Sequence, residues 1–154
     1  MTIAIGADHR GLEAARKIAE HIRAGGREVR MMGPCDESPC DYPERAAEVA
    51  SAVASGEAEL GILLCGTGIG MSIAANKVRG VRAAVVHDEL TAELSRSHND
   101  ANVLCLSADL MGEQALRQIV DRWLATGFEG GRHARRVRKI AAIEQGEDPA
   151  TVPD

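Results

Sequence analysis

Cys65 begins the run Cys65-Gly66-Thr67-Gly68-Ile69-Gly70, whose residue types and spacing could do chemistry. Three alternate glycines between an apolar run and a helical pattern allow backbone N–H groups to converge on one point, where they can bind an anion. N–H dipoles beside a thiol favour the thiolate, which is a competent base or nucleophile. The spacing therefore predicts a reactive cysteine at the mouth of an anion site.

Other interpretations of this loop remain open. The turn could bind nothing, and Cys65 could be a structural cysteine, which is the commoner fate of a buried thiol. A dinucleotide site is a further alternative, but the fingerprint G-x-G-x-x-G needs a third glycine where Met71 stands. Cys105 is interpreted as core, and Cys35 and Cys40 lie in a loop without an assigned role. No two cysteines have the C-x-x-C spacing of a zinc or thioredoxin-type site, so no metal is expected.

Two polar pairs flank predicted strands. Asp8 and His9 directly follow the first strand, which places them at the same sheet edge as Cys65 if the sheet is parallel. His98 and Asn99 precede the fifth strand and belong to the opposite edge. A role beside Cys65 would therefore require a second subunit to supply them. The alternative for His98 is a capped helix end with a solvated imidazole.

The one dense basic segment of the sequence is residues 130–139. Arg132 and Arg136 are four residues apart, so they share one helical face. Two guanidiniums on one face beside a helix start can clamp a phosphate, although a solvated charged face is the alternative. A nucleic-acid partner is disfavoured by the net charge of −5 and by an aromatic content of 2%, which leaves few stacking platforms.

The elements that must position these residues follow from hydrophobic periodicity. Short apolar runs predict strands at 2–7, 28–32, 59–65, 81–87 and 102–107. Amphipathic segments, several ending at glycine, predict helices at 11–24, 41–55, 71–78, 88–97, 112–126 and 132–145. Successive βα units imply a single α/β domain with a doubly wound, five-stranded parallel sheet. The simplest strand order is 2-1-3-4-5, with its ligand-binding switch point between strands 1 and 3.

A single domain is expected to cover residues 1–146, followed by a flexible tail at 147–154. The amino-terminal segment has no charged region followed by a long apolar run, so no signal peptide is expected. No apolar stretch approaches the roughly 20 residues that span a bilayer, so no membrane partner is expected. The default interpretation is a cytoplasmic protein with reduced thiols.

Together these motifs resemble the type B ribose-5-phosphate isomerases, a family that also includes the galactose-6-phosphate isomerase subunits. The segments that carry the resemblance are GADHRG (6–11), DYP (41–43), GILLCGTGIGMSIAANK (61–77), LSRSHNDANVL (94–104) and EGGRHARRV (129–137). The resemblance implies a Rossmann-like sheet and a homodimer or homotetramer. It also implies active sites at subunit interfaces, with the C-terminal helix in subunit contacts.

By position, the resemblance implies that Cys65 moves the C2 proton of a sugar phosphate and that His98 assists opening of the furanose ring. The hydroxyl of Thr67 is placed to help a proton pass between O1 and O2. The implied contacts of the sugar and the cis-enediolate are Asp8, His9, Tyr42, Gly66, Gly68, Ile69, Gly70 and Asn99. Arg132 and Arg136 are implied to hold the phosphate, and no cofactor is required.

Asp109 is a departure from the family pattern, because many relatives have an arginine in this segment that helps to hold the phosphate. An anion in its place should reduce phosphate affinity unless Arg10 or Arg135 compensates. The expected reaction interconverts ribose 5-phosphate and ribulose 5-phosphate. The alternatives are the same chemistry on allose 6-phosphate, galactose 6-phosphate or a tetrulose phosphate, and, from another class, a nucleotide-binding module or a catalytically silent binding protein.

Overall fold

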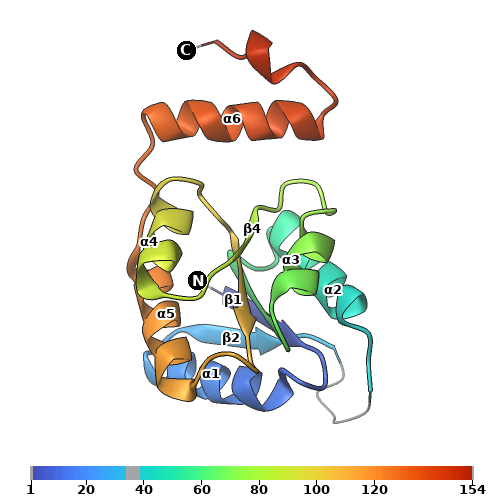
Figure 1. Cartoon of the computed structure of the whole chain (residues 1–154), viewed down its shortest axis with the longest axis vertical. Helices are drawn as coiled ribbons and strands as arrows, with labels where there is room; N and C mark the ends of the chain where they lie inside the picture. Colours follow the sequence, from blue (N-terminus) through green and yellow to red (C-terminus); the bar gives the residue numbers. More distant parts are fainter. Residues whose placement is uncertain (1, 34–38, 154) are drawn as a thin grey trace.

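Five parallel strands form the centre of the molecule, with helices on both faces of the sheet (Figure 1). The computed structural model describes residues 2–33 and 39–153. The strands are β1 (Thr2–Ala7), β2 (Glu28–Met31), β3 (Leu60–Cys65), β4 (Ala83–Val85) and β5 (Val103–Ser107). The helices are α1 (Leu12–Ala24), α2 (Tyr42–Ala54), α3 (Ile69–Ala75), α4 (Glu89–Ser97), α5 (Glu113–Ala125) and α6 (Arg132–Glu144), followed by a 3-10 turn, η1 (Pro149–Thr151). The predicted α/β fold is confirmed.

Each face of the sheet has its own apolar core. Helices α1, α4 and α5 cover one face, where Ile18, Ala92 and the fully buried Trp123 pack on the strands. Helices α2 and α3 cover the other face, where Val49 and Met71 are fully buried. Every residue of β3 is buried, as expected for a central parallel strand that is covered on both sides. Burial of this kind holds the carboxyl end of β3 rigidly in place.

The predicted strand order is wrong in one respect. The sheet has the order β2-β1-β3-β5-β4, so β5 lies between β3 and β4. The reason is burial: all of β5 is buried, whereas β4 has only three residues and each is half exposed. A short, partly exposed strand suits a sheet edge, and an apolar one suits the centre. The switch point between β1 and β3 is unaffected, because these strands are neighbours as expected.

Helix α6 lies apart from both helix layers, beyond the amino edge of the sheet (Figure 1). Only His133 and Ala142 of this helix are buried, while Ile140 and Ile143 are 44% and 61% exposed. In the segment predicted to be a flexible tail, η1 follows α6, and the Arg138 guanidinium donates to the carbonyl of Pro153 at 3.3 Å. Within the described ranges, every helix is too short or too polar to cross a bilayer.

Candidate active site

Cys65 is the last residue of β3 and lies at the carboxyl edge of the sheet, where it is 5% exposed. The backbone N–H of Gly68 donates a hydrogen bond to its Sγ at 3.1 Å. A hydrogen bond to an ionised acceptor is stronger than one to a neutral acceptor, so this N–H is a better partner for a thiolate than for a thiol. Cys105, the other cysteine of this core, is fully buried, and burial raises the pKa of its thiol.

The glycines of the loop after Cys65 are required by its geometry. Gly68 has φ of 76°, and a β-carbon there would lie 3.1 Å from the backbone of Leu106. A β-carbon on Gly70 would lie 2.6 Å from the ring of Tyr42, so this ring covers the first turn of α3. Tyr42 is nevertheless 42% exposed. The loop and the Tyr42 ring thus form one continuous surface beside Cys65.

Thr67 and Ile69 are the exposed residues of this loop. The Oγ1 of Thr67 accepts a hydrogen bond from the N–H of Ile69 at 3.3 Å. This contact leaves the hydroxyl proton of Thr67 free to be donated elsewhere, because only its oxygen is used. The side chain can therefore act as a proton donor at the surface of the loop.

Asp8 and His9 follow β1 at the same edge, because β1 and β3 are parallel neighbours. Asp8 is 7% exposed, and its Oδ1 accepts hydrogen bonds from the N–H groups of Arg10 at 3.0 Å and Gly11 at 2.9 Å. These bonds fix the turn that leads into α1. His9 is exposed and so lies open to a ligand.

Arg10 and Asp109 form an ion pair directly over the loop. Asp109 Oδ2 accepts from Nη2 of Arg10 at 2.6 Å and from its Nε at 3.0 Å. A β-carbon on Gly66 would lie 2.7 Å from the same Oδ2. The carboxylate that departs from the family pattern is therefore part of this surface, and Arg10 neutralises it.

His98, Asn99, Arg132 and Arg136 lie at the opposite edge of the sheet. His98 ends α4 and precedes the amino end of β5, whereas Cys65 pairs with Ser107 at the carboxyl end of β5. Asn99, Arg132 and Arg136 are exposed. The length of β5 thus separates these side chains from Cys65 within one chain, as the order of the elements predicted (Figure 1).

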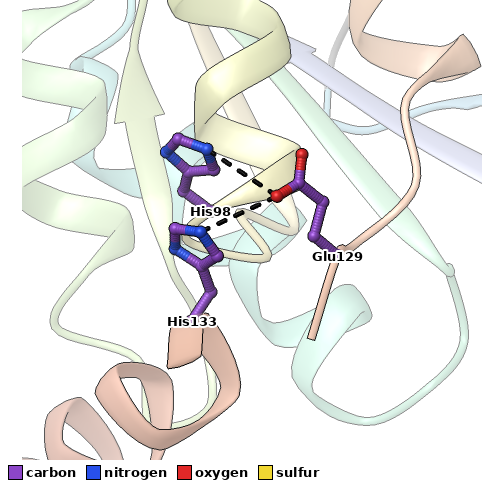
Figure 2. A group of neighbouring side chains, drawn as sticks. All are labelled: His98, Glu129 and His133. Carbon is purple, nitrogen blue, oxygen red and sulfur yellow. Dashed lines mark ion pairs between the residues drawn. The ribbon is translucent and has the colours of Figure 1, made fainter. Parts of the chain in front are cut away.

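His98, Glu129 and His133 form a cluster at this second edge (Figure 2). The rings of His98 and His133 stack with centroids 4.0 Å apart and planes inclined by 9°. Glu129 Oε2 lies 3.9 Å from Nε2 of His98 and 3.7 Å from Nε2 of His133. Burial, followed by the charges of His98 and Arg132, lowers the pKa of His133.

Among the described residues, these three form a group that could hold a metal ion. One potential ligand atom from each residue lies within 4.8 Å of the other two. The ring geometry does not suit one. The lone pairs of an imidazole lie in the ring plane, so two nearly parallel rings cannot both direct theirs at a single ion. A cation would also face Arg132, whose Nε lies 3.4 Å from Nε2 of His133. The cluster suits the handling of a proton better than the binding of a metal.

Comparison with known proteins places the chain in a family. The model of the ribose/galactose isomerase family matches residues 3–140. The chain belongs to this family. Ribose-5-phosphate isomerase B of Escherichia coli is 48% identical over 143 residues, which cover 93% of this chain and 96% of that protein. D-erythrulose-4-phosphate isomerase of Pectobacterium atrosepticum is 41% identical over 149 residues, covering 96% of this chain and 97% of that protein.

Solved structures of the ribose/galactose isomerase family agree with this fold. The Clostridium thermocellum ribose-5-phosphate isomerase B has a TM-score of 0.93 at 49% identity, covering 95% of this chain and 99% of that one. The Mycoplasma genitalium ribose-5-phosphate isomerase B, solved with bound ribulose-5-phosphate, has a TM-score of 0.90 at 45% identity, covering 94% and 96%. The predicted family resemblance is confirmed.

The predicted site residues of this family member fall into two groups. Those at the carboxyl edge are Asp8, His9, Tyr42, Cys65, Gly66, Thr67, Gly68, Ile69 and Gly70. Those at the amino edge are His98, Asn99, Arg132 and Arg136. Cys35 lies outside the described residues, and Cys40 is a free, partly buried thiol in the segment before α2.

The sequence pattern assigned no role to Glu129 or His133. Glu129 and His133 stand in the quoted segment 129–137, and their nearness to Arg132 was the signal that could have pointed to them. Arg10 was named as one possible compensation for Asp109, and the ion pair shows it in that position. Arg135 lies on α6, at the other edge of the sheet.

Replacing Asp109 by asparagine is expected to lower the KM for a sugar phosphate. The change removes a negative charge from the surface of the glycine loop, which is predicted to bind an anion, and frees Arg10, while the side chain keeps its size. The pair is partly exposed, so we expect a decrease of about three- to tenfold, smaller at high salt, and a lesser change in kcat. Steady-state kinetics at two ionic strengths measures it, with Glu113→Gln, which disrupts the surface pair with Lys17, as the control. A higher KM in Asp109→Asn would contradict this role.

Proposed function

We propose that this protein interconverts an aldose phosphate and its ketose phosphate, with ribose 5-phosphate and ribulose 5-phosphate as the preferred pair. The observation that carries the proposal is the hydrogen bond from the Gly68 N–H to the Sγ of Cys65, inside a glycine loop at the switch point of the sheet. Parallel α/β sheets bind their ligands at this point. Membership of the ribose/galactose isomerase family supports the reaction class.

In this proposal Cys65 acts as the base. Its thiolate removes the proton from C2 of the open aldose, and the same group returns a proton to C1. The intermediate is a cis-enediolate, whose negative charge faces the amides of the loop from Gly66 to Gly70. Thr67 passes a proton between O1 and O2, and Asp8, His9 and Tyr42 contact the sugar hydroxyls. Every step is a proton transfer, so the mechanism uses no metal and no organic cofactor.

We propose further that each active site contains residues of two subunits, in a homodimer or homotetramer. For His98 to open the ring and for Arg132 and Arg136 to bind the phosphate, these residues must lie beside Cys65. Within one chain they lie at the opposite end of β5 from Cys65. A second copy can supply them. The exposed Ile140 and Ile143 of α6 also line a hollow of ≈ 470 Å³ together with Asn99, which gives this edge an apolar surface for a partner subunit.

The proposed chemistry fits a reducing compartment such as the cytoplasm. Cys65 must be a free thiol to act as a base, and disulfides are rare where thiols are kept reduced. Cys40, Cys65 and Cys105 are free in the structure. The net charge of −5 fits a small-molecule substrate better than a nucleic acid.

A panel of sugar phosphates tests the proposed substrate. The purified protein, with a metal chelator present, is assayed with ribose 5-phosphate, allose 6-phosphate, galactose 6-phosphate and D-erythrulose 4-phosphate. We expect the highest kcat/KM with ribose 5-phosphate, by about tenfold or more over each of the others. Preference for the tetrulose phosphate would assign that substrate and keep the reaction class. Turnover of none, by folded protein, would reject an isomerase, and NAD binding that survives Cys65→Ala would favour the nucleotide-binding alternative.

A further inference from the structure

The cluster of His98, Glu129 and His133 brings together side chains from three separate parts of the chain. His98 ends α4, Glu129 lies in the segment between α5 and α6, and His133 lies in the first turn of α6. The N–H of Glu129 donates to the carbonyl of Ser97 at 3.0 Å, which ties this segment to the end of α4. Three parts of the chain thus converge on one imidazole that is partly exposed (Figure 2).

The hydrogen bond from Arg132 favours the neutral state of His133. Nε of Arg132 always carries its proton, so at 3.4 Å it can only donate to Nε2 of His133. That ring nitrogen is then an acceptor, and the ring is a neutral tautomer with its proton on Nδ1. The side chain of His133 is 7% exposed, so its charged form would also lose most of its hydration. The lowered pKa of His133, caused first by burial, agrees with this assignment.

The stacked geometry allows only one of the two rings to be charged at a time. Two imidazolium rings with centroids 4.0 Å apart would repel each other strongly in a partly buried site. The Glu129 carboxylate lies near both rings, so burial and Arg132 make the difference between them. His133 is buried and also faces Arg132, whereas the His98 side chain is 36% exposed. Arg136, on the same helix as His133, adds a second positive charge on that side. A proton shared by the pair therefore belongs on His98.

We propose that Glu129 and His133 are positioning residues for His98: His133 is a neutral platform that holds the His98 ring by stacking, and Glu129 is the counter-charge for its protonated form. Together they direct the proton needed for ring opening to the exposed imidazole. The proposal rests on the proposed role of His98 in the isomerase. It adds that Arg132 has two tasks, because the same guanidinium that is placed to bind phosphate also fixes the tautomer of His133.

The test separates ring opening from the proton transfer at carbon. Ribose 5-phosphate is mostly a furanose, whereas ribulose 5-phosphate cannot form a furanose because its O5 carries the phosphate. Turnover of ribose 5-phosphate therefore needs ring opening. Exchange of the C1 hydrogen of ribulose 5-phosphate with D2O, followed by proton NMR, needs only the chemistry of Cys65. Both rates are measured on the full-length protein for each variant.

We expect His133→Ala and Glu129→Gln to lower ribose 5-phosphate turnover by about 10- to 100-fold while the exchange rate stays within about threefold of wild type, since only the acid step is affected. His133→Phe, which keeps a neutral stacked ring, should recover much of the turnover that His133→Ala loses. His21→Ala is the matched control, because it removes a histidine–carboxylate contact with Asp121 between α1 and α5 and should change neither rate.

Equal losses of turnover and exchange in His133→Ala would overturn the proposal, since they would indicate a structural or phosphate-binding role. Unchanged turnover in both His133→Ala and Glu129→Gln would also overturn it. A wild-type protein with neither turnover nor exchange would instead reject the isomerase function itself, so the two failures are distinguishable. If His133→Ala is poorly folded by circular dichroism, the comparison of His133→Phe with Glu129→Gln decides the question.

Discussion

Replacing Cys65 by alanine is expected to lower kcat/KM for ribose 5-phosphate by about 10³-fold, the contribution typical of a well-placed general base. Alanine removes the thiol at the mouth of the glycine loop, which is the group proposed to take the proton from C2. The change is small in volume, so the loop and the core beneath it should keep their structure. Cys65→Ser should lose nearly as much activity, because a hydroxyl is a far weaker acid than a thiol and so does not supply the anionic base. The serine oxygen still accepts a hydrogen bond from the Gly68 N–H, so this variant keeps the structure of the loop.

Cys105→Ala is the matched control for this experiment. Its thiol is fully buried in β5, and burial raises its pKa, so it has no access to substrate. We expect this variant to lose about 1 kcal/mol or more of unfolding free energy in urea but to keep kcat/KM within about threefold of wild type. A Cys65→Ala protein that retains a tenth of the activity would show that another group is the base.

The fold was predictable because its signals are local. Runs such as residues 59–65 are too short for a helix and apolar on both faces, which indicates a central strand. The order of β4 and β5 was not predictable by assuming that consecutive strands are neighbours. The charged Arg82 within the predicted strand at 81–87, against the uncharged apolar run at 103–107, was the sequence signal that β4 lies at the edge. In the structure β4 is partly exposed and β5 is buried. Burial, more than chain order, decides which strand is central.

The candidate site was predictable where strand ends bring residues together. Asp8 and Cys65 follow parallel strands at the switch point, so the topology alone places them at one edge. The chain order likewise placed His98 at the opposite edge. The Arg10–Asp109 pair spans 99 residues of sequence, and no periodicity reports such a contact. The stacking of His98 on His133 was hidden for the same reason, because it depends on how α6 packs against the end of α4.

Mixing two inactive variants is expected to restore activity if each site contains residues of two subunits. Cys65→Ala destroys the carboxyl-edge half of a site, and His98→Asn destroys the amino-edge half. In a mixed dimer of these variants, one site combines the intact Cys65 of one subunit with the intact His98 of the other. The second site carries both substitutions and stays inactive.

The expected recovery is about a quarter of wild-type activity, because random reassembly makes about half of the dimers mixed and each has one intact site of two. The variants are unfolded together in urea, refolded and assayed with ribose 5-phosphate, beside each variant refolded alone. A tetramer built from such pairs gives the same fraction. Analytical ultracentrifugation of the refolded mixture establishes that assembly is complete.

The matched control combines Cys65→Ala with Asp8→Asn. Both residues lie at the carboxyl edge, where Asp8 holds the turn after β1 beside the end of β3. A mixed dimer of these variants has one damaged group in each site, so the mixture should have no more than the mean activity of the two variants refolded alone. Recovery with His98→Asn but not with Asp8→Asn assigns His98 to the partner's site. Absence of recovery in both mixtures would mean that Cys65 and His98 do not share a site across subunits, and that His98 acts where the single chain leaves it, beside Glu129 and His133.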